Sequence, residues 1–364
     1  MRPHLRDIPI AALPAALAEA GLRKPSFWAP RLAVRIHRHG ARTFDELDED
    51  PEMGPRVRAA LEAHFAFGPL LEHAGERIAE DKTRKDLWRL RGGEIVETVL
   101  LRNQKGRTLC VSSQAGCGLG CTFCATGRIG LMKNLTPGEI TESILGAERR
   151  AGERISDIVF MGQGEPLHNY DAVMAACDTI ADEYGQMISK RRITVSTVGL
   201  TPQIRRFVAE RKPWRLHLSL HSAIQETREQ IMPIARTHPL PELLDAMRSV
   251  QHDLERKWLT FQYVAIPDVN MDEAHIDALE QQLDGMQYIL NVIPWNETGV
   301  GYRPPSWEEV KDFTTRLRRL DCPVKIRYSG GKQEGMGCGQ LSAEQIQVAA
   351  TGGHLLAPPG IFTR

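Results

Sequence analysis

The sequence predicts an α/β fold: a partial (β/α) barrel preceded by a small helical domain at the amino terminus. Five short apolar runs alternate with helical stretches through the second half of the chain, which is the pattern of a parallel sheet with helices on its outside. A group of polar or glycine residues follows each of these runs. The first ninety or so residues instead show helical spacing, broken by proline and glycine.

The helical domain is predicted to cover residues 1–92. Its helices fall within 14–20, 26–38 and 55–67, where apolar residues recur at helical spacing. The charged stretch 80–86 leads towards Arg91-Gly92-Gly93, and we place the boundary there. Residues 93–345 then form the core barrel with a C-terminal cysteine loop, and residues 346–364 form a tail.

Two β segments open the barrel region, Ile95–Leu101 and Thr108–Ser112. A helix begins at Thr136-Pro137-Gly138-Glu139, which supplies an N-cap residue, a proline at the first helical position and the glutamate of a capping box. The alternating elements follow. Strands are expected at 158–161, 193–195, 216–220, 259–266 and 288–293, and helices at 172–183, 241–254 and 307–320.

Composition indicates an ordinary soluble globular protein, with 42% hydrophobic and 25% charged residues. No apolar run approaches the roughly 20 residues that span a bilayer, and no signal peptide opens the chain. We therefore expect a cytoplasmic protein without a membrane partner. The net charge is zero, so the overall field gives no sign of a polyanionic partner. Local basic clusters such as Lys190-Arg191-Arg192 are more often solvated faces than nucleic-acid sites.

Three cysteines carry the strongest chemical signal, in the run Cys117-Gly-Leu-Gly-Cys121-Thr-Phe-Cys124. Three thiolates can hold three irons of a [4Fe-4S] cube and leave the fourth iron open. The usual ligand of that iron at this spacing is S-adenosylmethionine (SAM), which an electron from the cluster cleaves to an adenosyl radical. Structural zinc prefers four ligands in paired motifs, and no second pair is present. The odd total of seven cysteines also argues against a disulfide framework.

Polar motifs at the ends of the apolar runs predict a substrate cavity. They are Gly162-Gln-Gly-Glu165-Pro166, Ser196-Thr197-Val-Gly199, Ser219-Leu220-His221, Pro267-Asp268-Val-Asn270 and Pro294-Trp295-Asn296. Each motif alone could be a turn or a helix cap. Five in succession indicate one rim, because barrel enzymes build their sites at the carboxyl ends of their strands.

The motifs together resemble those of the radical-SAM RNA adenosine methyltransferases. This family comprises the RlmN type, which methylates C2 of adenine, and the Cfr type, which methylates C8. The resemblance runs from about Glu97 to Leu341, and the chain looks like a divergent RlmN-like member. Its most specific parts are Thr108-Leu-Cys110-Val-Ser-Ser-Gln114, Cys124-Ala-Thr-Gly127, Asn134-Leu135-Thr136, Ser219-Leu220-His221 and Gly337-Cys338-Gly339-Gln340-Leu341. It implies a radical-SAM partial (β/α) barrel, with residues 1–92 as an accessory RNA-binding domain.

The resemblance assigns three catalytic roles. Cys338 would carry the methyl group as S-methylcysteine, and its glycine-rich setting suits a mobile loop. Cys110 would form a transient disulfide with Cys338 to release the product, and Glu97 would be the proton acceptor. Judged from the residues alone, Cys110 is expected to be a packed core thiol, and Glu97 is expected to lie on the polar face of an edge strand.

The resemblance also assigns the cofactor contacts. Cys117, Cys121 and Cys124 would bind the [4Fe-4S] cluster. SAM would be held by the rim residues Gly164, Glu165, Ser196, Ser219, Leu220 (through its backbone), His221 and Asn296. A carboxylate such as Glu165 suits the ammonium group of SAM. Cys177 and Cys322 are assigned to packing or loop structure.

Two departures from the family pattern stand out. Gln163 occupies a position where the family usually has methionine, and Arg327–Glu334 replaces an Arg-rich segment. The second departure bears on which nucleotide is modified.

We expect an RNA methyltransferase of the EC 2.1.1 class, with C2 favoured. Its implied partners are large-subunit rRNA, tRNA as a second RNA, and an electron donor such as flavodoxin or ferredoxin, and a monomer is favoured. The alternatives are C8 methylation, a radical-SAM enzyme acting on a substrate other than RNA, and an iron–sulfur redox sensor. The Cys110/Cys338 pair and the five-motif rim argue against the last two.

Overall fold

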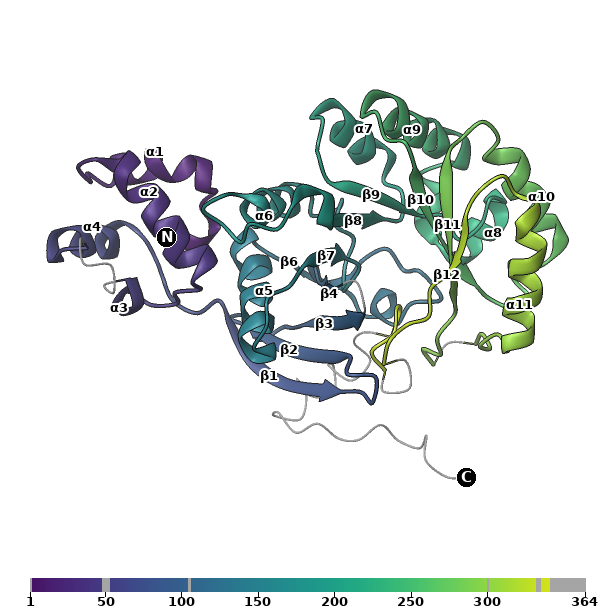
Figure 1. Cartoon of the computed structure of the whole chain (residues 1–364), viewed down its shortest axis with the longest axis horizontal. Helices are drawn as coiled ribbons and strands as arrows, with labels where there is room; N and C mark the ends of the chain where they lie inside the picture. The colour runs from purple at the N-terminus through teal and green to yellow at the C-terminus, as the bar shows by residue number, and fades with distance from the viewer. Residues whose placement is uncertain (1, 48–52, 104–105, 300, 332–334, 341–364) are drawn as a thin grey trace.

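A ten-stranded sheet forms the centre of the computed structural model, which describes residues 2–47, 53–103, 106–299, 301–331 and 335–340. The strand order is β1-β2-β3-β4-β7-β8-β9-β10-β11-β12, and β5 and β6 form a separate hairpin (Figure 1). The strands are β1 Leu71–Ile78, β2 Arg84–Leu90, β3 Ile95–Asn103, β4 Gly106–Val111, β5 Gln114–Cys117, β6 Gly130–Asn134, β7 Asp157–Phe160, β8 Ile193–Thr197, β9 Arg215–Ser219, β10 Leu259–Ala265, β11 Tyr288–Pro294 and β12 Val324–Ile326.

The sheet has an antiparallel part and a parallel part. Strands β1 to β4 pair antiparallel, and every pair from β4 through β7 to β12 is parallel. The two end strands, β1 and β12, are the edges of this order, so the predicted partial barrel is confirmed. The α-helices are α1 Leu13–Glu19, α2 Pro25–Ala33, α3 Phe44–Leu47, α4 Pro55–His64, α5 Pro137–Ala151, α6 Tyr170–Ala181, α7 Thr201–Ala209, α8 Gln225–Ile231, α9 Leu240–Asp253, α10 Glu273–Gln282 and α11 Trp307–Arg316.

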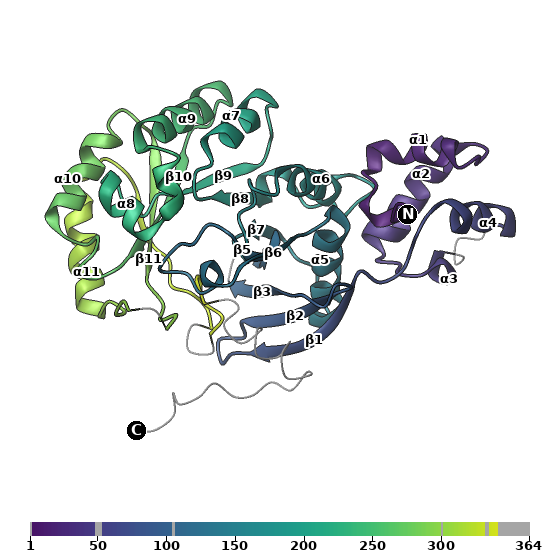
Figure 2. The same cartoon turned by 180° about the vertical axis from the view of Figure 1, so that it is seen from behind.

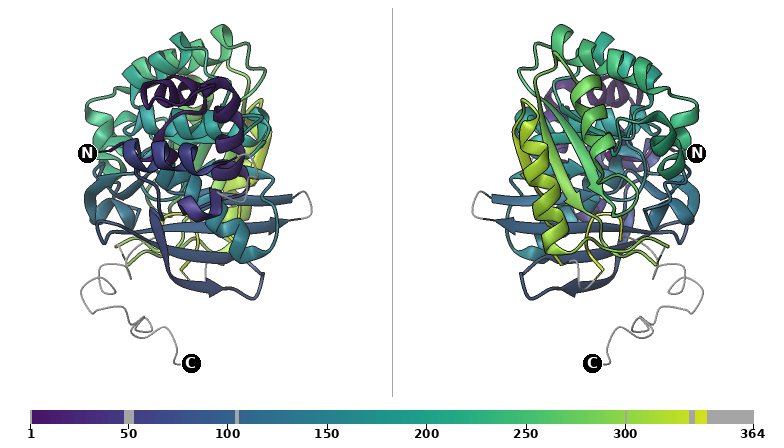
Figure 3. Two further views of the ribbon diagram at one scale, coloured as in Figure 1. Left: turned by 90° about the vertical axis from the view of Figure 1, so that its left-hand side faces the viewer. Right: turned by 90° about the vertical axis from the view of Figure 1, so that its right-hand side faces the viewer.

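Local sequence explains the parallel part. Every residue of β8 is buried, and β10 is buried at all positions except Thr260, as expected for strands covered on both faces. Helix α5 begins with the predicted capping box between Thr136 and Glu139. It ends at Gly152, whose left-handed φ of 69° closes the last turn. In Figure 3, α11 (yellow-green) lies along the strands of the C-terminal half.

The N-terminal helices form a second core and dock on α5. Leu17, Leu32 and Ile36 centre this core. Arg6 is buried, donates to two backbone carbonyls of its own unit, and lies 3.3 Å from the Glu142 carboxylate of α5. Figure 2 shows the N-terminal unit at the end of the molecule away from α10 and α11. Its position is therefore fixed by polar contacts as well as by apolar burial.

The helical character predicted up to residue 92 is wrong for residues 71–90. The N-terminal helices end with α4 at His64, and β1 and β2 join the central sheet. In the charged stretch 80–86 that leads towards the predicted boundary, residues 83–86 are buried. Asp86 is 1% exposed and receives hydrogen bonds from Arg84 and Arg150. Its charge is compensated by Arg84 of the same strand and by Arg150 of α5, and the second partner is not visible in a local sequence pattern.

The tail predicted at 346–364, together with Leu341, lies outside the described residues. In the ranges that are described, no helix has the length and apolar character needed to cross a membrane.

Candidate active site

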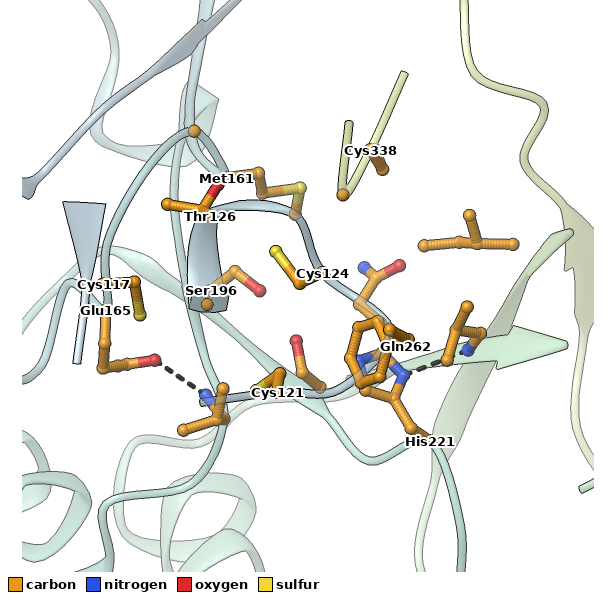
Figure 4. A pocket seen from close by; sticks show the side chains of 18 of the residues that line it. Cys117, Cys121, Cys124, Thr126, Met161, Glu165, Ser196, His221, Gln262 and Cys338 are labelled. Carbon is orange, nitrogen blue, oxygen red and sulfur yellow. Dashed lines mark hydrogen bonds between the residues drawn. The ribbon is translucent and has the colours of Figure 1, made fainter. Parts of the chain in front are cut away.

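A cavity opens at the carboxyl ends of the parallel strands (Figure 4). It is lined by residues of four of the five predicted rim motifs, by the three motif cysteines and by Cys338. From the rim these are Gly162, Gly164, Glu165, Pro166, Ser196, Thr197, Val198, Ser219, His221, Pro294, Trp295 and Asn296. The motif after β10 is absent from the lining. Its Asn270 is fully buried and donates to the carbonyls of His221 and Val264, so it supports the rim from behind.

The cysteines stand at the end of β5 and in the loop that joins β5 to β6. Cys117 ends β5, and Cys121 and Cys124 follow in a loop whose amide at Thr122 donates to the Ile231 carbonyl. Gly116 has a φ of +73°, and a Cβ there would lie 2.0 Å from the Gly130 carbonyl oxygen. This glycine lets the two hairpin strands approach closely enough to aim Cys117 at the cavity.

The three thiols fit an iron–sulfur cube better than a single ion. Burial, more than any other cause, raises the pKa of Cys117 to about 11, and it raises that of Cys121 well above its ordinary value. Thiols in such a setting ionise readily only against a cationic metal centre. In the described ranges, no group of three His, Cys, Asp or Glu side chains converges as ligands of one metal ion. A cube accounts for this arrangement, since it spreads three sulfurs over three irons.

Arg228 supplies a buried positive charge beside the cysteines. It is 1% exposed, and its charge opposes the rise in the Cys121 pKa. Its guanidinium donates to the Ser219 carbonyl at 3.0 Å and to the carbonyls of Leu220 and Val198. Arg228 therefore ties together the chain segments that follow β8 and β9, and it compensates negative charge at the cluster position.

Glu165 is a buried carboxylate that holds two rim segments. Its oxygens accept hydrogen bonds from the amides of Leu167 and Val198, both at 2.9 Å. Burial raises its pKa to about 7, against the opposing effect of these hydrogen bonds. Gly164, at a φ of +94°, passes so close to Gln114 that a Cβ would lie 2.5 Å from the Gln114 Cβ. The Gly-Glu pair thus presents a carboxylate with bare backbone beside it, a suitable arrangement for an ammonium group.

His221 lines the far side of the cavity as a neutral ring. Burial lowers its pKa to about 3. Its Nδ1 accepts a hydrogen bond from the Val264 amide at 3.0 Å, which places the ring proton on Nε2. Its backbone has a left-handed φ of 60°, and Phe123 packs edge-on against the ring with centroids 4.9 Å apart.

Ser196 and Ser219 also face the cavity, whereas Leu220 is not among its lining residues. The Leu220 amide donates to the Gln262 carbonyl at 3.0 Å, and its own carbonyl accepts from Arg228. The backbone contact predicted for Leu220 therefore finds its groups already engaged within the protein.

Cys338 and Gly339 line the cavity from the chain segment that follows β12. Asn296 Nδ2 donates to the Cys338 carbonyl at 3.0 Å and to Ser329 Oγ at 2.8 Å. The Cys338 amide donates to the same Ser329 Oγ at 3.2 Å. The Gly339 carbonyl accepts from the amide of Ala125, the residue after Cys124. Cys338 is thus held beside the cluster-binding loop, and Figure 4 shows it at the edge of the space that the other cysteines surround.

Cys110 and Glu97 lie on one face of the antiparallel part, next to this loop. Cys110 pairs with Val99 across β3 and β4, so Glu97, two residues from Val99, shares its face. Burial raises the pKa of Cys110 to about 12, and the neighbouring Cys338 adds to the rise. Lys85 Nζ lies 3.8 Å from Glu97 Oε1 and donates to the Gly335 carbonyl at 3.2 Å. The predicted catalytic trio is therefore gathered at one place.

Known proteins resemble this chain over most of its length. The profile of the radical SAM superfamily matches residues 111–279. The chain is 40% identical to a protein named dual-specificity RNA methyltransferase RlmN 1 of Myxococcus xanthus, over 93% of this chain and 94% of that protein. The chain belongs to the RlmN-type radical-SAM methyltransferases. Its cofactors are accordingly a [4Fe-4S] cluster and SAM, and it is an enzyme.

Two further relatives cover nearly the whole chain. A probable RNA methyltransferase of the same organism is 36% identical, over 98% of this chain and 99% of that one. A radical SAM methyltransferase from Sphaerobacter thermophilus has a crystal structure that matches with a TM-score of 0.84 at 35% identity, covering 93% and 98% of the two chains. The fold predicted from strand–helix alternation is thus the fold of a radical-SAM methyltransferase.

The departures from the RlmN family pattern have structural reasons. Gln163 is buried, and its Oε1 accepts the Gly116 amide at 3.4 Å, so it supports the cysteine hairpin. In the divergent segment, a Cβ at Gly330 would lie 2.5 Å from Thr83 Oγ1. A side chain at Gly330 would therefore require Thr83 to move. Gly331 also lies against the turn between β1 and β2, where Asp81 Oδ2 accepts its amide at 3.0 Å.

Sequence reasoning missed several residues of this RlmN-type site. Thr126, Met161 and Gln262 line the cavity. Lys85 lay in the charged stretch taken as a boundary, and nothing local marked it as a contact of Glu97. The position of Gln262 gave one usable signal, since a glutamine within an apolar strand run faces either a partner or a cavity.

Proposed function

We propose that this enzyme methylates a ring carbon of adenine in RNA, with C2 favoured over C8, through a methyl group carried by Cys338. The observation that carries the proposal is the position of Cys338: it lines the same cavity as Cys117, Cys121 and Cys124. A radical enzyme without a thiol carrier has no need of a fourth cysteine there. The names of the relatives support RNA as the substrate, and we propose large-subunit rRNA, with tRNA as a second RNA, from the family resemblance.

When bound, the cluster and SAM supply one-electron cleavage of a carbon–sulfur bond, which yields an adenosyl radical. We assign the cluster to Cys117, Cys121 and Cys124. The SAM contacts are assigned to Gly164, Glu165, Ser196, Ser219, His221 and Asn296. Glu165 would accept the ammonium group, because a buried carboxylate already supported by two amides is fixed in place.

The remaining roles belong to residues around the loop. Cys338 would hold the carbon that bonds to the base. As the ring regains aromaticity it would lose a proton, which Glu97 would take, and one electron, which the redox cofactor would take back when bound. Cys110 would then attack the Cys338 sulfur. An S–S bond forms, the S–C bond breaks, and the carbon keeps the electron pair and gains a proton, which completes the methyl group. The high pKa of Cys110 means that its thiol needs a base before it attacks.

A comparison of cellular RNA tests the proposal. RNA from a strain lacking this gene and from its parent would be digested to nucleosides and analysed by mass spectrometry against 2-methyladenosine and 8-methyladenosine standards. We expect 2-methyladenosine to disappear in the deletion strain. The proposal fails if no methyladenosine is lost, and loss of the 8-methyl isomer alone would reverse the C2 assignment.

We further propose that the enzyme works in the cytoplasm, where its RNA is found, that it acts as a monomer, and that a flavodoxin or ferredoxin reduces it. The helical N-terminal unit is proposed to bind RNA, as its position in the family implies.

A further inference from the structure

Two exposed aromatic side chains stand beside the Cys338 loop. Trp307 is 57% exposed and begins α11, and Tyr328 is 48% exposed and follows β12. Their ring centroids are 6.0 Å apart with an interplanar angle of 35°. Single exposed apolar side chains are common, but two aromatic rings in contact form a larger apolar surface, which is a feature of binding sites.

Tyr328, one member of this aromatic pair, lines a groove that shares residues with the active-site cavity, and Trp307 reaches the groove through its contact with Tyr328. The groove is lined by Tyr328, Ser329, Gln340 and the Pro304-Pro305 pair, and it shares Pro294, Trp295 and Asn296 with the cavity. Tyr328 also precedes Ser329, whose Oγ accepts the Cys338 amide at 3.2 Å. The aromatic pair, which we call the platform, is therefore joined to the Cys338 loop by one peptide bond and one hydrogen bond.

The two consecutive side chains that follow Ile326 of β12 point in different directions. The Arg327 guanidinium lies 3.2 Å from the sulfur of Met161, a residue that lines the cavity, and it lowers the pKa of Cys110, so Arg327 points towards the cavity side. Tyr328 points outward to Trp307. Arg327 and Tyr328 therefore present a cation on one side and an aromatic ring on the other, where the family usually has an Arg-rich segment.

We infer that Trp307 and Tyr328 stack an unpaired nucleobase next to the modified adenine. The inference rests on the proposed RNA substrate and identifies a second contact of that same site. An adenine that enters the cavity must leave its helical stack, which also unstacks its neighbour. Exposed aromatic faces accept such a base in any sequence, because every base has a π-face. Continuity of the groove with the cavity supports an RNA occupant of this platform.

The test uses the full chain, reconstituted anaerobically and reduced with dithionite, with an unmodified large-subunit rRNA transcript as the probe. In W307A and Y328A we expect the KM for the transcript to rise about fivefold or more, from the usual contribution of one stacked base. W307F and Y328F should stay near wild type because they keep a ring. Methylation of Cys338 by SAM, measured by intact mass without RNA, should be unchanged.

Trp258→Ala is the matched control. Trp258 is 43% exposed and precedes β10, so it lies at the amino end of the strands, away from the cavity. The inference is overturned if W307A and Y328A keep the wild-type KM, or if W258A raises it equally. It is also overturned if the two variants lose turnover only when a protein electron donor replaces dithionite, because the platform would then bind that donor. Failure of the proposed function looks different: wild-type protein would gain no methyl on Cys338.

Discussion

Gly116 lies where the cysteine hairpin is most tightly closed, and replacing it by alanine tests how the hairpin serves the cluster. A Cβ at this position would lie 2.0 Å from the Gly130 carbonyl oxygen, whereas ordinary contact begins at 3.4 Å, so β5 and β6 must separate by about 1.4 Å. The left-handed φ of +73° adds a cost of roughly 1–2 kcal/mol for any residue with a side chain. Overpacking against backbone costs about 1–3 kcal/mol more.

Gly130 on the facing strand provides the matched control. It also has a left-handed φ, +78°, but a Cβ there would meet nothing within 4 Å. Gly130→Ala is therefore destabilised by backbone strain alone, which costs about 1–2 kcal/mol of folding free energy. The two variants change the same hairpin by the same methyl group, and they differ only in the clash.

Iron and sulfide content per chain after anaerobic reconstitution is the assay, with the thermal midpoint of the apo-protein measured beside it. We expect Gly116→Ala to lose most of its iron, because Cys117 directly follows the displaced residue. Gly130→Ala should keep its iron and lose a few degrees in thermal midpoint. Equal iron content in the two variants would refute the view that close approach of β5 and β6 positions Cys117.

Further predictions concern the catalytic trio and the cofactor contacts. Cys338→Ala should abolish RNA methylation with unchanged iron content, and residual methylation would exclude the carrier role. Cys110→Ala should trap the protein on RNA, seen as a slow gel band that nuclease removes, and its absence would count against the resolving role. Protonation of Glu165 (pKa about 7) removes the charge that an ammonium group needs, so SAM affinity should fall about tenfold per pH unit below 7. A similar slope in Glu165→Gln would contradict this. Lys85→Met should lower the free energy of unfolding by about 3 kcal/mol and slow RNA methylation, since it removes the cation beside Glu97; unchanged urea denaturation would contradict it.

The parallel part of the fold was predictable where its strands are buried on both faces, as β8 and β10 are. The runs 193–195 and 259–266 are mostly apolar, and the described strands β8 and β10 coincide with them closely. The capping box at Thr136 fixed the start of α5 from four residues. These signals depend only on residues that are close in the sequence, and tertiary contacts do not override them.

The hairpin β1–β2 was not predictable in the same way. Glu76, Arg84 and Asp86 alternate with few apolar residues, and their charges are paired across strands and with Arg150 of α5. Ion pairs between residues more than sixty positions apart produce no periodic pattern in the sequence. The same reason hid Lys85, whose partners Glu97 and Gly335 are brought to it only by the sheet.

The site was largely predictable as a set of residues, and less so as a set of contacts. Six of the seven rim residues assigned to SAM line the cavity together. Leu220 does not, because Arg228 and Gln262 engage its backbone. Asn296 faces the cavity but bonds to the Cys338 loop. Spacing along the chain predicts which end of a strand a residue occupies, but it does not predict the hydrogen bonds made there.

The sheet ends at β1 on one side and at the three-residue β12 on the other. The gap between them is crossed by the chain after β12, which reaches the β1–β2 hairpin at Asp81 and at Lys85. A strand in that position would be fixed by a ladder of backbone pairs, whereas the described residues on either side make single hydrogen bonds of about 1 kcal/mol each to the hairpin. Because the described strands β1 and β12 do not pair with each other, the sheet is not a closed ring. A long polymer therefore has no closed ring of strands through which a free end would have to thread.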